Sequence, residues 1–131
     1  MKTIRINLND IKKDLEARGY KLAHNTFENA VKQYIKDNKD MMLGEFDKDY
    51  SAGVDIKLTN VSHKLTNINI DDMTADIEIL DTPQGKLLQE IMNSGFQCKP
   101  VVNATVEKNK RDKTKIYQIF SFDFTARPDE N

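Results

Sequence analysis

Residues 80–95 read Leu-Asp-Thr-Pro-Gln-Gly-Lys-Leu-Leu-Gln-Glu-Ile-Met-Asn-Ser-Gly, a stretch that combines capping residues, a proline and a final glycine. Asp81 or Thr82 can cap a helix here, and Pro83 suits its first turn, where the missing N–H would have no partner anyway. Gly95 can adopt the left-handed conformation that ends a helix. The stretch therefore predicts the end of a strand and then a helix with one apolar stripe, made of Leu87, Leu88, Ile91 and Met92.

Two more helices are predicted nearer the N-terminus. A short strand over residues 4–8 is followed by a helix that Asn9 can cap and that Gly19 can end. Asn25 or Thr26 can cap the next helix. Its apolar residues recur with the period of an amphipathic helix, at Phe27, Ala30, Val31, Tyr34 and Ile35.

Alternating apolar and polar residues predict a series of strands. Residues 54–58, 61–70 and 75–80 each show this period of two. The alternation slips between Leu65 and Ile68, which predicts a β-bulge in the middle strand.

The C-terminal part reads as a hairpin. Residues 100–107 and 115–125 are predicted strands, joined by a charged turn over 108–113. Alternation in the last strand places Ile116, Phe120, Phe122 and Phe124 on one face and Tyr117 and Ile119 on the other. Together with the earlier elements, this gives six or seven strands and three helices. We therefore expect an α+β domain built on a closed or nearly closed sheet.

The composition of the chain limits the kinds of binding partner that we expect. The chain has 20 basic and 21 acidic residues and a net charge of −1, which argues against a phosphate-binding surface for nucleic acid. Cys98 is the only cysteine, so no internal disulfide can form, and a reducing compartment is the simplest inference. No apolar run reaches the length of a membrane span, and the N-terminus lacks the apolar block of a signal peptide. We expect a soluble protein that is intracellular at synthesis and has no membrane partner.

Several stretches, in order, resemble the prohead (capsid-maturation) proteases of tailed bacteriophages. They are Asn-Thr-Phe-Glu-Asn-Ala-Val-Lys-Gln-Tyr-Ile at 25–35, Leu-Gly-Glu-Phe-Asp at 43–47, Val-Ser-His-Lys at 61–64, Ile-Leu-Asp-Thr-Pro-Gln-Gly-Lys at 79–86, and Phe-Ser-Phe-Asp-Phe at 120–124, which is followed by Arg127-Pro128. The resemblance covers about residues 20–128. It implies one prohead-protease-like domain over residues 1–131, with residues 1–19 outside the resemblance and a polar tail at 126–131. The implied fold, shared with the herpesvirus assemblin proteases, is an antiparallel β-barrel of six to seven strands flanked by about three helices.

The positions that carry catalysis in that family are changed here. The family uses a serine activated by a histidine that directly follows the Leu-Gly-Glu motif region, and the resemblance puts Lys48 at that place. Counting from Gly95, the family's Ser-Ser-Arg-Gly motif falls on Val101-Val102-Asn103-Ala104. Serine proteolysis needs a hydroxyl or thiol beside a proton acceptor and donors for the oxyanion. The resemblance therefore implies a scaffold without its catalytic groups.

His63 and Cys98 remain as weaker candidates. We interpret His63 as a structural histidine of the barrel, because no second His, Cys or carboxylate stands at ligand spacing from it. No metal or cofactor is therefore expected. Cys98 lies three residues before the family's serine position and could serve as a substitute nucleophile with His63 as its base. A lone cysteine is more often a small buried hydrophobe.

The leading hypothesis from the sequence is a non-catalytic structural or assembly protein of a phage virion or prohead, synthesised in the host cytoplasm. Its partners would be capsid, portal-vertex or scaffold proteins, or further copies of itself in a symmetric assembly. This step is an analogy, because a fold does not fix a function. The alternatives are a regulator or inhibitor of the active prohead protease, and a residual protease that uses Cys98.

Overall fold

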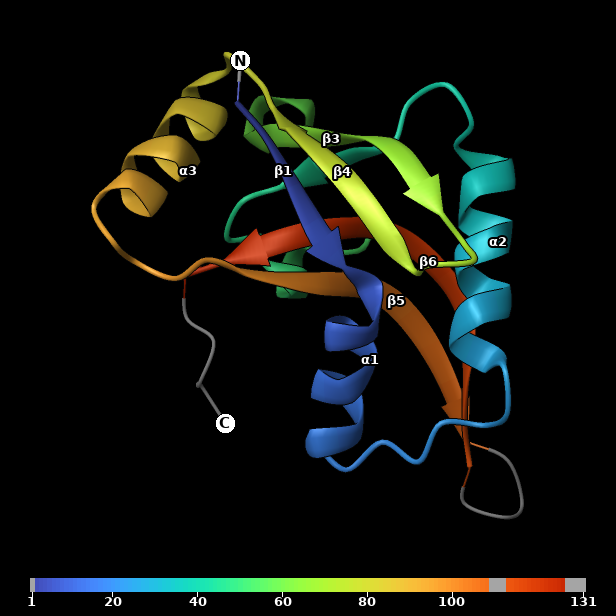
Figure 1. Ribbon diagram of the computed structural model, residues 1–131. Helices are drawn as coiled ribbons and strands as arrows, with labels where there is room; N and C mark the ends of the chain where they lie inside the picture. Colours follow the sequence, from blue (N-terminus) through green and yellow to red (C-terminus); the bar gives the residue numbers. More distant parts are fainter. Residues whose placement is uncertain (1, 109–112, 127–131) are drawn as a thin grey trace.

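The computed structural model describes residues 2–108 and 113–126, which form an α+β structure (Figure 1). The helices among these residues are α1 (Leu8–Ala17), α2 (Thr26–Asp37) and α3 (Pro83–Asn93). The strands are β1 (Lys2–Asn7), β2 (Leu43–Glu45), β3 (Val61–Asn69), β4 (Thr74–Ile79), β5 (Lys99–Lys108) and β6 (Thr114–Thr125), and short 3-10 turns cover Tyr50–Ala52 and Leu58–Asn60. Most of the predicted turn at 108–113 and of the predicted tail at 126–131 lies outside the described residues.

The strands form two antiparallel sheets. The first has the order β1-β4-β3-β2, and the second is the hairpin of β5 and β6. The sheets meet where β2 ends, through a parallel bridge between Phe46 and Phe124. The backbone N–H of Asp47 donates to the carbonyl oxygen of Phe124 over 2.8 Å at the same place.

The predicted closed or nearly closed barrel of six to seven strands is wrong. Within the described residues, β1 pairs only with β4 and β5 pairs only with β6, so the outer edges of β1 and β5 do not join. The physical reason is the chain path after β1, which turns directly into α1. That helix packs against both β4 and β5, and Asp14 of α1 forms an ion pair with Lys99 of β5. Helix α1 therefore lies where β1 and β5 would have to pair to close a barrel.

The core lies between the two sheets and under α2. Phe27, Val31 and Tyr34 of α2 are buried, as the amphipathic period predicted, and α2 packs on β6. The rings of Tyr34 and Phe122 meet edge to face, with centroids 5.2 Å apart. This geometry is favourable for aromatic pairs. The contact fixes α2 over the second sheet.

Helix α3 forms as predicted. Thr82 is the N-cap, and its hydroxyl oxygen accepts from the backbone N–H of Gly85 over 3.0 Å. The same hydroxyl donates to the carbonyl oxygen of Val61 over 2.6 Å, which ties the helix start to β3. Gly95 follows the helix with φ of 92°, the conformation that its position predicted.

Local capping differs from the prediction at the other two helices. Asn7 rather than Asn9 caps α1, and its side-chain oxygen accepts from the backbone N–H of Asn9 over 2.9 Å. Asn25 precedes α2 in the left-handed conformation, with φ of 58°, and makes no side-chain capping bond. The hydroxyl of Thr26 is also diverted, because it accepts from the backbone N–H of Ile116 over 2.8 Å. A tertiary contact has replaced the local one.

One predicted strand is absent, and another changes its faces. Residues 54–57 are irregular, and Leu58, which begins a 3-10 turn, is 75% exposed, because no strand among the described residues lies beside this alternating stretch. In β3 the register shifts between Leu65 and Asn67, which confirms the predicted bulge. In β6 the register against β5 shifts twice, so the predicted faces are wrong: the side chains that are buried are Ile116, Ile119, Phe122 and Phe124, whereas Phe120 is half-buried and Tyr117 is 70% exposed.

Among the described helices, none combines the length and the apolar character that a membrane crossing requires.

Candidate functional site

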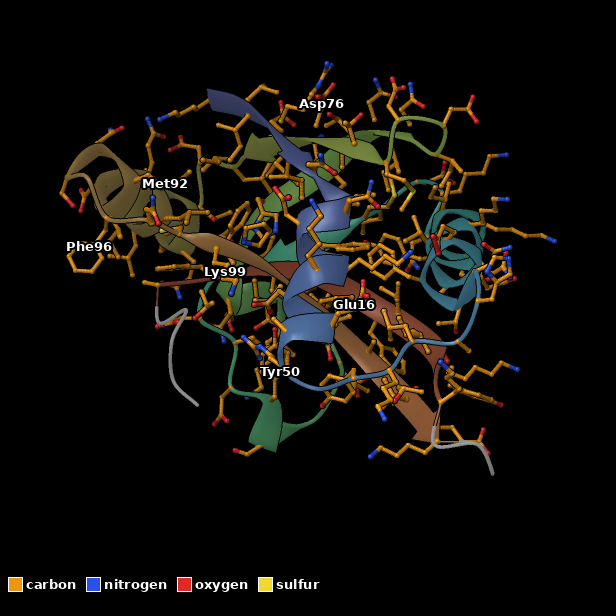
Figure 2. All side chains as sticks on the ribbon, turned by 60° about the horizontal axis from the view of Figure 1, so that its bottom comes forward. Glu16, Tyr50, Asp76, Met92, Phe96 and Lys99 are labelled. Atoms are coloured by element: carbon orange, nitrogen blue, oxygen red, sulfur yellow. The ribbon has the colours of Figure 1, made fainter. Side chains whose placement is uncertain are left out.

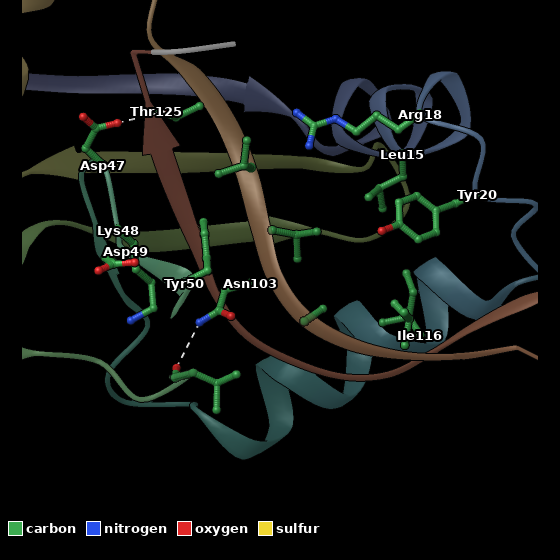
Figure 3. A pocket seen from close by; sticks show the side chains of 15 residues that line it. Leu15, Arg18, Tyr20, Asp47, Lys48, Asp49, Tyr50, Asn103, Ile116 and Thr125 are labelled. Atoms are coloured by element: carbon green, nitrogen blue, oxygen red, sulfur yellow. Dashed lines mark hydrogen bonds between the residues drawn. The ribbon is translucent and has the colours of Figure 1, made fainter. Parts of the chain in front are cut away.

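A pocket of about 820 Å³ opens between the end of α1, the loop after β2 and the strand β5 (Figure 3). Its walls include Lys48, Val101 and Val102, so the structure brings together the three positions to which the sequence resemblance assigned the family's catalysis. In the view of Figure 3, Arg18 and Tyr20 lie on one side of β5. This pocket is the candidate site.

Lys48 forms an ion pair inside the protein. Its Nζ lies 2.7 Å from Glu45 Oε2 and 2.7 Å from the carbonyl oxygen of Asp55, so it donates to both. The two charged side chains are only 3% and 1% exposed. Asp47, with φ of 57°, turns the chain between them. A protonated ammonium group has no lone pair with which to accept a proton, so this lysine is arranged as a structural counter-ion and not as a general base.

The segment of β5 to which the sequence resemblance assigned the nucleophile offers no nucleophile at Val101 and Val102. Val101 and Val102 are half-buried and carry neither a hydroxyl nor a thiol. Asn103 is buried, and its amide nitrogen donates to the carbonyl oxygen of Val54 over 3.0 Å and to Ser121 Oγ over 3.2 Å. The Asn103 amide thus connects the loop at Val54 to the second sheet.

A buried carboxyl group lies behind the pocket. Asp123 accepts hydrogen bonds from the backbone N–H of Glu45 over 2.9 Å, the Tyr50 hydroxyl over 3.0 Å and the Ser121 hydroxyl over 3.0 Å. Burial, with a smaller effect from the nearby Glu45, raises the pKa of Asp123 despite these donors. Burial and then the charge of Asp123 raise the pKa of Tyr50 as well.

This polar network was not predicted from the sequence. Its members come from three separate parts of the chain, and only their meeting in the fold defines it. The available signal was weak: Ser121 and Asp123 alternate with phenylalanines in a strand, where polar residues ordinarily face water. Both are buried here, because β2 and the loop after it cover that face of β6.

His63 forms a hydroxyl–imidazole pair, but away from the pocket. Its Nδ1 lies 2.7 Å from Ser62 Oγ, and its Nε2 lies 2.8 Å from the carbonyl oxygen of Phe122. A carbonyl can only accept, so Nε2 carries the hydrogen and Nδ1 accepts from the serine. Burial lowers the pKa of His63 to about 4, against a smaller opposing effect of the Phe122 carbonyl. Both residues have 0% exposure, and neither lines the pocket.

A register shift explains why neighbouring residues in a strand touch. Gly44 pairs with His63 and Glu45 pairs with Val61, so Ser62 is the extra residue of a bulge. Gly44 packs directly over the imidazole, where a Cβ would lie 2.2 Å from His63 Nε2. The pair is therefore sealed between two strands, and a substrate has no path to it.

Cys98 lies in the link between α3 and β5 and is half-buried against the core. Burial, and then the charge of Asp47, raise the pKa of its thiol. Both effects disfavour the thiolate, which is the reactive form. Cys98 does not line the pocket that contains Lys48. Across the described residues there is also no group of three His, Cys, Asp or Glu side chains placed to hold a metal ion.

Comparison with known proteins supports the fold. No family model matches the chain, and no curated protein matches its sequence. Among solved structures, the chain is similar to the bacteriophage T4 capsid assembly protease, gp21, with a TM-score of 0.60 and 13% sequence identity. The match covers 77% of this chain and 68% of that one. At this identity the similarity shows a protease-like fold, which is the part of the predicted resemblance that is confirmed.

Proposed function

We propose that this chain is a non-catalytic structural or assembly protein of a bacteriophage particle, which uses a protease-like fold to bind capsid, portal-vertex or scaffold proteins. The similarity to a phage capsid assembly protease supports a role in capsid maturation or assembly. In this proposal, the fold serves for binding to capsid components and not for catalysis. The phage context and the binding role are both part of the proposal.

The observation that carries the proposal is the side-chain content of the pocket. The Lys48 ammonium group donates to Glu45 Oε2 and to the carbonyl oxygen of Asp55, and a protonated amine has no lone pair with which to accept a proton. Val101 and Val102 line the same pocket and cannot attack a carbonyl carbon. The base and the nucleophile that the resemblance assigns to Lys48, Val101 and Val102 are therefore missing together, and this argues against acyl transfer by these positions.

The alternative nucleophiles are poorly placed. Ser62 has the required partner in His63, but both are fully buried. Cys98 has a raised pKa, and no histidine is among the residues that line the pocket. A residual protease that uses Cys98 would need His63 to leave its bond with the Phe122 carbonyl. These contacts favour the non-catalytic alternative.

The first test asks whether the chain cleaves anything. Purified wild-type protein and the Cys98→Ala and Ser62→Ala variants are incubated with phage capsid and scaffold proteins, and the products are identified by mass spectrometry. We expect no cleavage by any of the three proteins. Cleavage by the wild type that disappears in one variant would overturn the non-catalytic proposal and identify the nucleophile.

The second test asks what the chain binds. Purified protein is sedimented with empty proheads, with a heat-unfolded sample as the control for trapping. Binding to proheads, and a constant copy number per mature particle by quantitative mass spectrometry, are the expected results. Absence from particles, combined with slower cleavage by the active prohead protease when this chain is added, would instead establish a regulator.

A further inference from the structure

Helix α3 carries an apolar strip that the described part of the protein covers only in part. The strip consists of Leu87, Ile91 and Phe96: Leu87 is 41% exposed, Phe96 is 65% exposed, and Ile91 is half-buried. Leu87 and Ile91 are four residues apart and lie on the same side of successive turns. Phe96 follows Gly95, and its backbone N–H donates to the carbonyl oxygen of Ile91 over 3.3 Å, which brings it against the last turn. Figure 2 shows its ring at the end of α3, pointing away from the body.

The strip borders the face with which α3 packs on the sheet: Ile91 packs partly against the core, whereas Leu87 and Phe96 lie outside that face. Gly85 and Leu88 are the buried residues of the helix, and α3 contacts β3 and β4. Leu87 lies about 100° around the helix axis from Leu88, so packing of the core does not require it to be apolar. Large apolar side chains that gather on an exposed helix side are a common mark of an interaction surface.

The charged residues beside the strip are complementary to the same residues of a second copy. Lys86 and Glu90 each precede a strip residue, are exposed, and lie one turn apart along the same flank. In a twofold, antiparallel pairing of two α3 helices, Lys86 of one copy lies towards Glu90 of the other, and the reverse pair forms by symmetry. Lys86 is now 3.6 Å from Asp81, but that pair is 67% and 81% exposed and contributes little.

The helix dipole favours the same arrangement. Helix α3 has no acidic residue in its first turn and no basic residue in its last turn, so its own side chains do not compensate either pole. Antiparallel pairing places the positive pole of one helix beside the negative pole of the other. The charges thus favour a second copy as the partner, and the dipole favours the antiparallel direction.

We propose that the α3 strip is the contact through which two copies of this chain pair, with their α3 helices antiparallel. The contact is small, so free protein in solution pairs weakly. It becomes effective where many copies are held at high local concentration, as in a symmetric assembly. The inference does not depend on the proposed function, because it concerns the purified chain alone.

The apolar part of the contact is tested by sedimentation equilibrium of the purified protein, from about 10 μM to about 1 mM, a range that covers weak association. We expect the wild type to form dimers as its concentration rises. Leu87→Ser and Phe96→Ser should each weaken the dimer about tenfold or more, the ratio that corresponds to about 1.4 kcal/mol. Leu58→Ser is the matched control, because Leu58 is also an exposed leucine, is 75% exposed and lies outside α3.

The charged part of the contact is tested by reversing the charges of Lys86 and Glu90. Lys86→Glu alone and Glu90→Lys alone place like charges across the twofold axis, so each should weaken the dimer. The double variant Lys86→Glu/Glu90→Lys restores opposite charges in both pairs, so it should recover most of the wild-type affinity. A protein that stays monomeric throughout the range would overturn the proposal. Equal weakening by Leu58→Ser, or no recovery in the double variant, would do so too.

Discussion

Lys48 and Glu45 form an ion pair of 2.7 Å whose two side chains are almost without exposure to solvent. Removing one partner of such a pair leaves an uncompensated charge inside the protein. Lys48→Met should therefore lower the free energy of unfolding by about 3–5 kcal/mol, measured by urea denaturation at neutral pH. The double variant Lys48→Met/Glu45→Gln, which removes both charges, should be distinctly more stable than the single one. A single variant within about 1 kcal/mol of wild type would contradict a buried pair.

His63 makes stability depend on pH. The pKa of His63 is about 4 in the folded protein, against an ordinary value of 6.5. Between pH 4 and pH 6.5, His63 is therefore protonated in the unfolded chain but not in the folded protein. Stability is fully present above pH 6.5 and falls by roughly 3 kcal/mol as pH drops to about 4.

The measurement compares wild type with His63→Gln by urea denaturation from pH 4 to 7.5. The raised pKa of Asp123 acts in the opposite direction, because it favours the folded state as pH falls. Both proteins contain Asp123, so its effect cancels in their difference. We expect the difference in unfolding free energy to shrink steadily below pH 6.5. The same pH dependence in both proteins would contradict the assignment to His63.

Gly44 has no room for a side chain. An added Cβ would lie 2.2 Å from His63 Nε2 and 2.2 Å from the carbonyl oxygen of Phe122, and both are fixed by their mutual hydrogen bond. Gly44→Ala should lower the unfolding free energy by about 3 kcal/mol or more. Gly19→Ala is the control, because Gly19 has φ of 95° but nothing within 4 Å of an added Cβ. That change should cost only about 1–2 kcal/mol in backbone strain. Equal thermal melting points for the two variants would show that the close contact is not there.

Tyr50 fastens the loop over the pocket through its bond to Asp123. Tyr50→Phe removes this donor and should release the loop without unfolding the sheets, with a loss of about 1–3 kcal/mol. Hydrogen exchange read by mass spectrometry should become faster in residues 49–57 and stay unchanged in β3 and β4. Tyr117→Phe is the matched control, because the Tyr117 side chain is 70% exposed. Uniformly faster exchange across the protein would mean that the bond supports the whole fold instead.

The sequence predicts well where the deciding interactions are local. Thr82 and Gly95 bound α3 because capping and left-handed turns depend on a few neighbouring residues. The slip between Leu65 and Asn67 was readable for a similar reason, since a bulge disturbs the alternation of side chains. Such features need no knowledge of distant segments.

Prediction fails where contacts between segments distant in the sequence determine the structure. The alternation at 54–58 could not reveal that no strand lies alongside, and the strand count could not reveal that α1 stands between β1 and β5. At the site, Lys48 was singled out through a resemblance, whereas its partner Glu45 and the buried Asp123 were not. Their roles arise from contacts across the chain, such as the 2.9 Å bond from the Glu45 N–H to Asp123.

The two register shifts in β6 affect how this chain can be compared with others. They fall between the pairs Asn103–Ser121 and Ala104–Ile119, and between Thr105–Gln118 and Val106–Ile116. Each adds one residue to a strand without adding a loop. A homologue that lacks one of them would align only with a single-residue gap inside a strand, which alignment methods usually penalise. Such homologues are found more readily by superposing backbones than by aligning sequences.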